Sequence, residues 1–368
     1  MNDHGAEHHI CLEAPPGLTF PESLDTLADR YAGVLRDAGL DKGSEVLVRI
    51  HASDIANQAA ALRERFDGPG RESVLSLVGQ PPAAGGKLAL EAYHMRPANG
   101  GGKLLHEPGA LLVGHGKYRS LWLSGAPTSP EGSYQQTLQV FGQLSAWMER
   151  LGGKIENDVQ RTWIYMRDVD NSYAGMVDAR RELFRFMGLN EGTHYIASTG
   201  IEGLAPRADQ LVLMDSLSVL GLHPTQVSYL EARDHLCPTH EYAVTFERGT
   251  RIVYGDRSHC YISGTASIDN QGNVLHVGDV VRQCRRTLAN IEALLDGSGT
   301  RLEDVKQLVC YLRDPADHPL VRDFLDQALP GGIPRIIVRG PVCRPTWLVE
   351  MEAICATPRG DERFAPFF

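Results

Sequence analysis

Apolar side chains recur at helical spacing in three stretches that are spread evenly along the chain. In each stretch the apolar positions fall three or four residues apart, as in a helix that buries one face. The predicted helices cover residues 23–38, 134–151 and 280–295. A loop and a short apolar strand follow each helix, at residues 45–50, 162–168 and 308–314. The same order of elements therefore occurs three times.

A second helix and two further strands complete each repeat. The second helices are predicted at residues 54–66, 173–186 and 318–329. The strand pairs are predicted at residues 73–78 with 87–92, 194–199 with 210–215, and 335–339 with 348–353. A matching hairpin segment opens the second and third repeats, at 119–126 and 258–265, and the first repeat is expected to lack it. This order predicts an α+β fold with three units in one chain, each a mixed β-sheet covered on one face by two helices.

Two stretches rich in glycine or polar residues, 96–109 and 221–239, are predicted to connect the repeats. They divide the chain into three units, at residues 1–100, 101–220 and 221–368. The first 18 residues lack the basic flank and apolar centre of a signal peptide. They contain His4, His8 and His9. We expect these histidines to lie in a mobile tail.

The third unit carries two charged residues at strand positions that are apolar or aromatic in the other units. The last strands align on a shared acid, at Glu91, Asp215 and Glu352. Two positions before that acid stand Ala89, Leu213 and Glu350. A second alignment, counted back from Gly79, Gly200 and Gly340, compares Val74, Tyr195 and Arg335. A solvated strand face would not be charged in one copy alone, so Glu350 and Arg335 mark a candidate site.

The composition limits the ligands and the compartment. The chain has 368 residues and a net charge of −10, which argues against binding to nucleic acid or to an anionic membrane surface. No apolar run reaches the length of a transmembrane helix. Its 7 cysteines are scattered and include no CxxC pair, as expected of reduced thiols in a cytoplasmic protein. Three potential metal ligands lie within residues 235–240, but no partner pair follows at zinc-finger spacing, so we expect no metal and no cofactor.

Several motifs resemble the chorismatase family, whose units are similar to RidA/YjgF domains. The RidA-like motifs of the third unit are Tyr261-Ile262-Ser263-Gly264, Tyr311-Leu312-Arg313-Asp314 and Val349-Glu350-Met351-Glu352-Ala353. The segments that resemble chorismatases more widely are 246–250, 254–259 and 263–268. The resemblance covers most of the chain and is stronger from Tyr118 onward. It implies a single chain that imitates the RidA trimer, with the site between units.

The resemblance also implies roles for particular residues. RidA sites are lined by an arginine and a last-strand glutamate, which match Arg335 and Glu350. Chorismatases remove the enolpyruvyl group of chorismate as pyruvate, and their catalytic acid matches Glu350. In the members that form 3-hydroxybenzoate, a cysteine lies seven positions before this acid, which matches Cys343. A glycine that accompanies this subgroup is placed at Gly264.

The chemistry of an enol ether agrees with these roles. Cleavage begins with protonation of the terminal methylene carbon, which needs a carboxylic acid that stays protonated near neutral pH. Glu350 suits this task if apolar neighbours desolvate it. Chorismate is a dianion, and guanidinium groups bind carboxylates at two points, so Arg335 and then Arg161 are the candidate clamps. We expect Cys343 to help exclude water and not to act as a covalent nucleophile.

These observations predict a cofactor-free enzyme that converts chorismate into 3-hydroxybenzoate and pyruvate, with some 4-hydroxybenzoate allowed. Three alternatives stay open: a hydrolytic chorismatase that yields a dihydroxycyclohexadiene carboxylate, an imine or enamine deaminase of RidA type, and a non-catalytic protein that binds a small molecule. Triplication within one chain predicts a monomer, and a homo-oligomer stays open.

Overall fold

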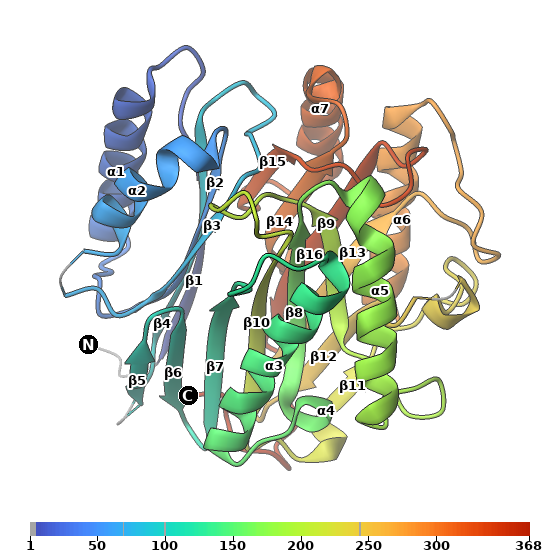
Figure 1. Ribbon diagram of the computed structural model, residues 1–368. Helices are drawn as coiled ribbons and strands as arrows, with labels where there is room; N and C mark the ends of the chain where they lie inside the picture. The colour runs from blue at the N-terminus through green and yellow to red at the C-terminus, as the bar shows by residue number, and fades with distance from the viewer. Residues whose placement is uncertain (1–4, 69, 99–100, 243) are drawn as a thin grey trace.

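Three mixed β-sheets face the centre of the molecule, and helices cover the outer face of each (Figure 1). The computed structural model describes residues 5–68, 70–98, 101–242 and 244–368. The α+β class and the three units predicted from the sequence are confirmed. No helix in these ranges is long and apolar enough to cross a membrane.

The first sheet has four strands in the order β1-β4-β2-β3. Its strands are β1 (Ala6–Glu13), β2 (Glu45–Ala52), β3 (Val74–Val78) and β4 (Leu88–Arg96). Its helices are α1 (Phe20–Asp37) and α2 (Ile55–Phe66). The β2–β3 pair is parallel and the other pairs are antiparallel, so the sheet is mixed.

The second sheet has six strands in the order β5-β6-β7-β10-β8-β9. These strands are β5 (Gly102–Glu107), β6 (Ala110–His115), β7 (Tyr118–Gly125), β8 (Val159–Met166), β9 (Ala197–Glu202) and β10 (Val212–Leu220). The helices of this unit are α3 (Ser133–Leu151), α4 (Ile155–Asp158) and α5 (Val169–Phe186).

The third sheet repeats this plan in the order β11-β12-β13-β16-β14-β15. Its strands are β11 (Val227–Tyr229), β12 (Gly249–Val253), β13 (Ser258–Ala266), β14 (Val305–Leu312), β15 (Arg335–Arg339) and β16 (Val349–Thr357). Its helices are α6 (Val280–Asp296) and α7 (His318–Ala328). Short 3₁₀ turns occur at Pro224–Gln226, Thr239–Tyr242, Leu302–Asp304 and Pro315–Asp317.

The N-terminal segment differs from the sequence prediction. His8 and His9 belong to strand β1, which pairs with β4 along its whole length, whereas His4 lies outside the described residues. β1 takes the place beside β4 that β7 and β13 take beside β10 and β16, so the prediction that the first unit lacks this segment was wrong. The tail prediction was wrong because polar side chains hid the alternation of a strand. Glu7 accepts hydrogen bonds from His259 and Arg257 of the third unit, so this polar residue of β1 faces inward.

The predicted connectors also hold strands. Residues 96–109 include β5, and residues 221–239 include β11, so each connector forms the outermost strand of the sheet that follows it. The second and third sheets each begin with an outer pair of strands, β5–β6 and β11–β12. The first sheet has only four strands because no described segment supplies such a pair.

The strand registers correct the alignment of the three units. The shared acids Glu91, Asp215 and Glu352 lie opposite Arg49, Trp163 and Val309. One residue earlier on these strands, the parallel partners are Leu75, Ser198 and Arg335. The alignment counted back from the glycines therefore matched Arg335 with the wrong residues of the other units. The reason is that Gly203, and not Gly200, occupies the position of Gly340. Ser198 is the counterpart of Arg335 in the second unit.

Buried hydrogen bonds join the three units in a cycle. Each shared acid accepts a bond from the preceding unit, in the pairs Gln307 to Glu91, Arg49 to Asp215, and Arg161 to Glu352. The Arg49 and Arg161 bonds measure 2.8 and 2.7 Å. All six side chains are buried, and removing one partner of a buried charge pair leaves the other charge uncompensated. The units are therefore parts of one body.

Candidate active site

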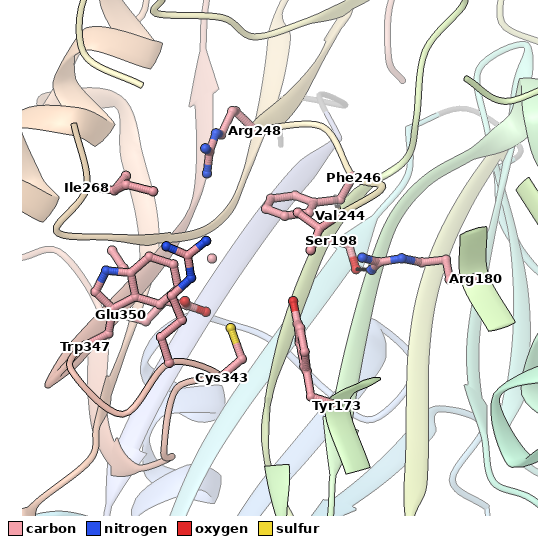
Figure 2. A pocket seen from close by; sticks show the side chains of 14 residues that line it. Tyr173, Arg180, Ser198, Val244, Phe246, Arg248, Ile268, Cys343, Trp347 and Glu350 are labelled. Atoms are coloured by element: carbon pink, nitrogen blue, oxygen red, sulfur yellow. Dashed lines mark hydrogen bonds between the residues drawn. The ribbon is translucent and has the colours of Figure 1, made fainter. Parts of the chain in front are cut away.

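A cavity of about 280 Å³ lies between the second and third units (Figure 2). Helix α5 and strand β9 line it from the second unit, and Val244, Phe246 and Arg248 line it from the segment between β11 and β12 of the third unit. Strand β13, the β15–β16 connection and the start of β16 line it from the third unit. The cavity is therefore built from segments that are far apart in the sequence.

Glu350 projects into this cavity from the start of β16. It is held between two neighbouring strands, opposite Ala266 on β13 and Tyr311 on β14, and is only 6% exposed. Burial raises the pKa of the Glu350 carboxyl to about 8, and the negative charge of Glu352 adds to this rise. Arg161 and Arg248 oppose it. Glu350 is therefore a protonated acid at neutral pH.

Gly264 lies against the carboxyl group of Glu350. It falls in an irregular stretch of β13, where the pairing with β16 shifts between Ile262 and Thr265. A β-carbon at Gly264 would stand 2.2 Å from Oε1 of Glu350. The acid can occupy this position because residue 264 has no side chain.

Cys343 shares the cavity with Glu350. Its side chain lies between those of Glu350 and Tyr173 in Figure 2. Burial raises the pKa of the Cys343 thiol to about 12, and the charge of Glu350 acts in the same direction, against a hydrogen bond with Tyr173. The thiol is therefore neutral at pH 7, and a neutral thiol is a poor nucleophile. The predicted grouping of Glu350, Cys343 and Gly264 is present in the structure.

Three arginines line the cavity that were not picked out from the sequence: Arg180, Arg248 and Arg344. Arg180 comes from α5, and its Nη1 donates to Ser198 Oγ at 3.4 Å. Arg248 donates from Nη2 to the carbonyl of Cys237 at 2.9 Å. The guanidinium carbons of Arg180 and Arg248 lie 5.9 and 5.6 Å from the ring centre of Phe246, and the two arginines are on opposite sides of this residue in Figure 2.

Arg344 extends this cationic lining from the third unit. Its Nη1 donates to the carbonyl of Gly272 at 3.1 Å, and its guanidinium carbon lies 4.6 Å from the ring centre of Trp347. Two signals could have located these arginines. Arg248 lies within the motif at 246–250, and Arg344 directly follows Cys343. Arg180 had no such signal, because it lies within an ordinary amphipathic helix.

The two arginines chosen from the sequence lie elsewhere. Neither Arg161 nor Arg335 is among the described residues that line the cavity. Arg161 is buried behind it, and its Nη2 donates to Glu352 at 2.7 Å. Arg335 is on β15, where it forms an ion pair with Asp326. The structure therefore does not bring Arg335 and Glu350 together.

Arg335 and Glu350 are separated because they face different neighbouring units. Strand β15 faces the first unit, where the Ile337 amide donates to Glu13 and the Ala83 amide donates to the Ile337 carbonyl. Glu350 faces the second unit, where the position of Arg335 is occupied by Ser198. In a homotrimer the two positions meet at every interface. In a fused chain they belong to different interfaces, and the sequence can differ between them.

Comparisons with known proteins match the third unit to a family model and a larger part of the chain to one relative. The family model of endoribonuclease L-PSP matches residues 250–357. The 3-aminoacrylate deaminase RutC of Acinetobacter baylyi is 33% identical over 95 residues, which are 26% of this chain and 75% of that protein. The 3-hydroxybenzoate synthase of Streptomyces hygroscopicus is 28% identical over 249 residues, which cover 61% of this chain and 71% of that protein.

A solved structure shows the same fold over nearly the whole chain. The crystal structure of a chorismatase superposes with a TM-score of 0.67 and covers 94% of this chain and 98% of its own, at 18% sequence identity. The arrangement of three units in one chain therefore occurs in another protein.

Proposed function

Because the chain belongs to the chorismatase family, whose units have the RidA/YjgF-like fold, we propose that it removes the enolpyruvyl group of chorismate. The products are 3-hydroxybenzoate and pyruvate. The observation that carries this proposal is Glu350, a carboxylic acid with a pKa of about 8 in a cavity lined by three arginines. The relative that is named a 3-hydroxybenzoate synthase supports the choice of product.

The cavity charges suit a substrate with two carboxylates. Arg180, Arg248 and Arg344 approach from different elements, so both carboxylates of chorismate can be paired with guanidinium groups. The protein as a whole is acidic, with a net charge of −10, so a dianion has to be held by such local cations. These three residues replace Arg335 and Arg161 as the clamps of the substrate.

Glu350 is the proton donor of the reaction. Its proton goes to the terminal methylene carbon of the enol ether, which becomes the methyl group of pyruvate. The ring carbon that bears the ether oxygen then loses that bond, and the bonding electrons form the keto group of the departing pyruvate. The neighbouring ring hydroxyl attacks the same carbon and gives an epoxide. Its hydroxyl proton balances the one that Glu350 donated.

The epoxide needs only to rearrange to become an aromatic phenol. One of its carbon–oxygen bonds breaks, and a hydrogen leaves the carbon that keeps the oxygen, which yields 3-hydroxybenzoate. No water, oxidant or reductant is consumed. The competing route adds water to the protonated enol ether and gives a dihydroxycyclohexadiene carboxylate. Cys343, with its neutral thiol, and the apolar side chains of Val244, Ile268 and Trp347 limit the room for that water.

The deaminase alternative has weaker support. The sequence comparison placed Arg335 and Glu350 in one RidA-like site, but the two residues lie at different interfaces of this chain. The discriminating experiment supplies the purified protein with chorismate in one reaction and 2-iminopropanoate in another. We expect pyruvate and 3-hydroxybenzoate from chorismate, by chromatography, and no acceleration of ammonia release from the imine. Ammonia release without chorismate turnover would favour the deaminase instead.

A further inference from the structure

Thr199 of strand β9 connects two groups that flank the acid, although it does not belong to the described lining of the cavity. Its Oγ1 accepts a hydrogen bond from the backbone amide of Gly264 at 2.8 Å and another from Nη2 of Arg161 at 2.5 Å. The same hydroxyl donates a short hydrogen bond to Oε2 of Glu352. One side chain of the second unit therefore holds the irregular stretch of β13 and the ion pair behind the cavity.

Glu352 is the neighbour through which this contact reaches the acid. Glu350 and Glu352 are two positions apart on β16, so their side chains share one face of the strand. Besides Thr199, Glu352 accepts bonds from Arg161 at 2.7 Å and from Nε1 of Trp163 at 2.9 Å. Glu352 is 5% exposed, so water does not screen its charge from Glu350.

Thr199 also limits the space around Gly264. A β-carbon at Gly264 would lie 3.1 Å from Cγ2 of Thr199 as well as 2.2 Å from Oε1 of Glu350. The methyl group of Thr199, the backbone of Gly264 and the carboxyl group of Glu350 are therefore packed together. The hydroxyl fixes the same group of atoms by hydrogen bonds. Displacement of Thr199 would move both neighbours of the acid.

The corresponding positions in the other units do not share this arrangement. The strand registers place Ser76 of the first unit and Ile336 of the third unit at the position of Thr199. The Ser76 hydroxyl finds no hydrogen-bond partner within the described part of the chain, and Ile336 has no hydroxyl. A unit can therefore fold without a hydroxyl at this position that is bonded to the shared acid. Such a hydroxyl occurs at the interface that holds the cavity.

We propose that Thr199 is a positioning residue for Glu350, which holds Glu352 and Gly264 so that the acid keeps its place and its proton. The proposal rests on the proposed function for its effect on catalysis. The charged groups that act on Glu350 are Glu352, Arg161 and Arg248. Thr199 contacts the first two directly and the third not at all in the described hydrogen bonds. It therefore acts on the acid through Glu352 and Arg161.

The test compares three substitutions at Thr199 with a matched control. Thr199→Val keeps the shape and removes the hydroxyl, Thr199→Ala removes the hydroxyl without added bulk, and Thr199→Ser keeps the hydroxyl. Ser76→Ala is the control at the same position of the first unit. We expect kcat for chorismate to fall about 10- to 100-fold in the valine and alanine variants, as for loss of a hydrogen bond to a charged group. The Thr199→Ser and Ser76→Ala variants should stay within about 3-fold of the parent, the range of a change that leaves this bond intact.

The pH dependence separates positioning from mere stabilisation. Without the hydroxyl, the Glu352 carboxylate is held only by Arg161 and Trp163 and can shift away from Glu350, so its charge raises the pKa of Glu350 less. The alkaline limb of kcat/KM should move to lower pH in Thr199→Val and Thr199→Ala, and should stay in place in Thr199→Ser. A lower melting temperature with unchanged kcat and an unchanged limb would overturn the proposal. A serine variant that behaves like the valine variant would overturn it too.

A titration that needs no substrate keeps this test apart from the proposed function. Protein labelled with ¹³C at the glutamate carboxyl groups is titrated by NMR, and the Glu350 signal is identified by its loss in Glu350→Gln. A lower Glu350 pKa in Thr199→Val than in the parent supports the proposal even if chorismate is not the substrate. An identical pKa in both proteins contradicts it. Absence of chorismate turnover by the parent protein counts against the proposed function alone.

Discussion

Gly264 lies so close to Glu350 that a β-carbon at residue 264 would stand 2.2 Å from the Glu350 carboxyl oxygen. The two residues come from adjacent strands, β13 and β16, at the point where their pairing is irregular. The position of the Glu350 carboxyl therefore depends on the missing side chain at residue 264. Its protonation depends on the apolar surroundings.

Substitution of Gly264 should impair catalysis more than stability. Gly264→Ala forces the Glu350 carboxyl aside and crowds Cγ2 of Thr199, but the atoms that must move belong to side chains and not to the backbone. We expect chorismate turnover to fall at least about 10-fold, because small misplacements of a reacting group are expensive. The control is Gly142→Ala on α3, where nothing lies within 4 Å of the added carbon. Full activity of Gly264→Ala would show that the close contact is irrelevant.

Activity should depend on the protonated form of Glu350. Its pKa is raised to about 8, so kcat/KM for chorismate should be flat near neutral pH and fall above pH 8 as the proton is lost. Measurement of initial rates from pH 6 to 10 checks this. A limb that begins near pH 5 would mean that Glu350 is an ordinary exposed carboxylate.

The same raised pKa makes a prediction about stability. A carboxyl group whose pKa is higher in the folded state stabilises the fold below its unfolded pKa, and that contribution is lost as pH rises through the folded pKa. Glu350→Gln removes the ionisable group, so it should unfold at higher denaturant concentration than the parent at pH 9. The difference in free energy of unfolding between Glu350→Gln and the parent should be roughly 3–5 kcal/mol larger at pH 9 than at pH 4, because a pKa difference of this size between the folded and unfolded states is linked to stability. Equal differences at both pH values would contradict the buried location of the acid.

Cys343 should affect the products and not the ability to turn over chorismate. Its thiol has a pKa of about 12 and is therefore not a nucleophile at pH 7. Cys343→Ala leaves space next to Glu350 that a water molecule can enter. We expect turnover within about 10-fold of the parent, since a cavity changes binding and packing by a limited amount, together with formation of the dihydroxycyclohexadiene carboxylate. Cys343→Ser is the companion variant. Complete loss of turnover in both variants would point to a covalent role.

The arginines that line the cavity should govern substrate binding. Arg344→Gln removes one guanidinium that faces the cavity and should raise the KM for chorismate about 10- to 100-fold, the usual value of a charge-assisted pair. Arg335→Gln removes a residue that pairs with Asp326 outside the cavity and should leave KM within about 2-fold, as for an exposed ion pair. A larger rise of the KM in Arg335→Gln than in Arg344→Gln would mean that Arg335 binds the substrate carboxylate.

The sequence predicted the elements well where one periodicity dominated. Helical spacing identified the paired helices of each unit, and comparison of the three units singled out Glu350, since Ala89 and Leu213 are apolar at its position. Strand β1 was missed because Glu7 and His9 are polar but face the third unit, where Arg257 and Gln307 pair with them. A polar residue that is satisfied by a distant unit cannot be distinguished from a solvated one by pattern alone.

The partners of the acid could not be predicted for a different reason. Which unit faces Glu350 depends on the order in which the three units are arranged around the centre. A repeat in the sequence does not predict that order. Arg335 was chosen because a homotrimer has one kind of interface, whereas this chain has three. Among the arginines that line the cavity, Arg180 on α5 comes from the adjacent unit and carries no local signal.

The most direct test of the central claim is a parallel measurement of products from chorismate with the parent protein and with Glu350→Gln. Both proteins are first shown to be folded by circular dichroism. Chromatography then quantifies 3-hydroxybenzoate, and an enzymatic assay quantifies pyruvate. We expect equal amounts of the two products from the parent protein and at least about 1,000-fold slower formation with Glu350→Gln, as for loss of a proton donor. Undiminished turnover by Glu350→Gln, or no turnover by the parent, would contradict the role of Glu350.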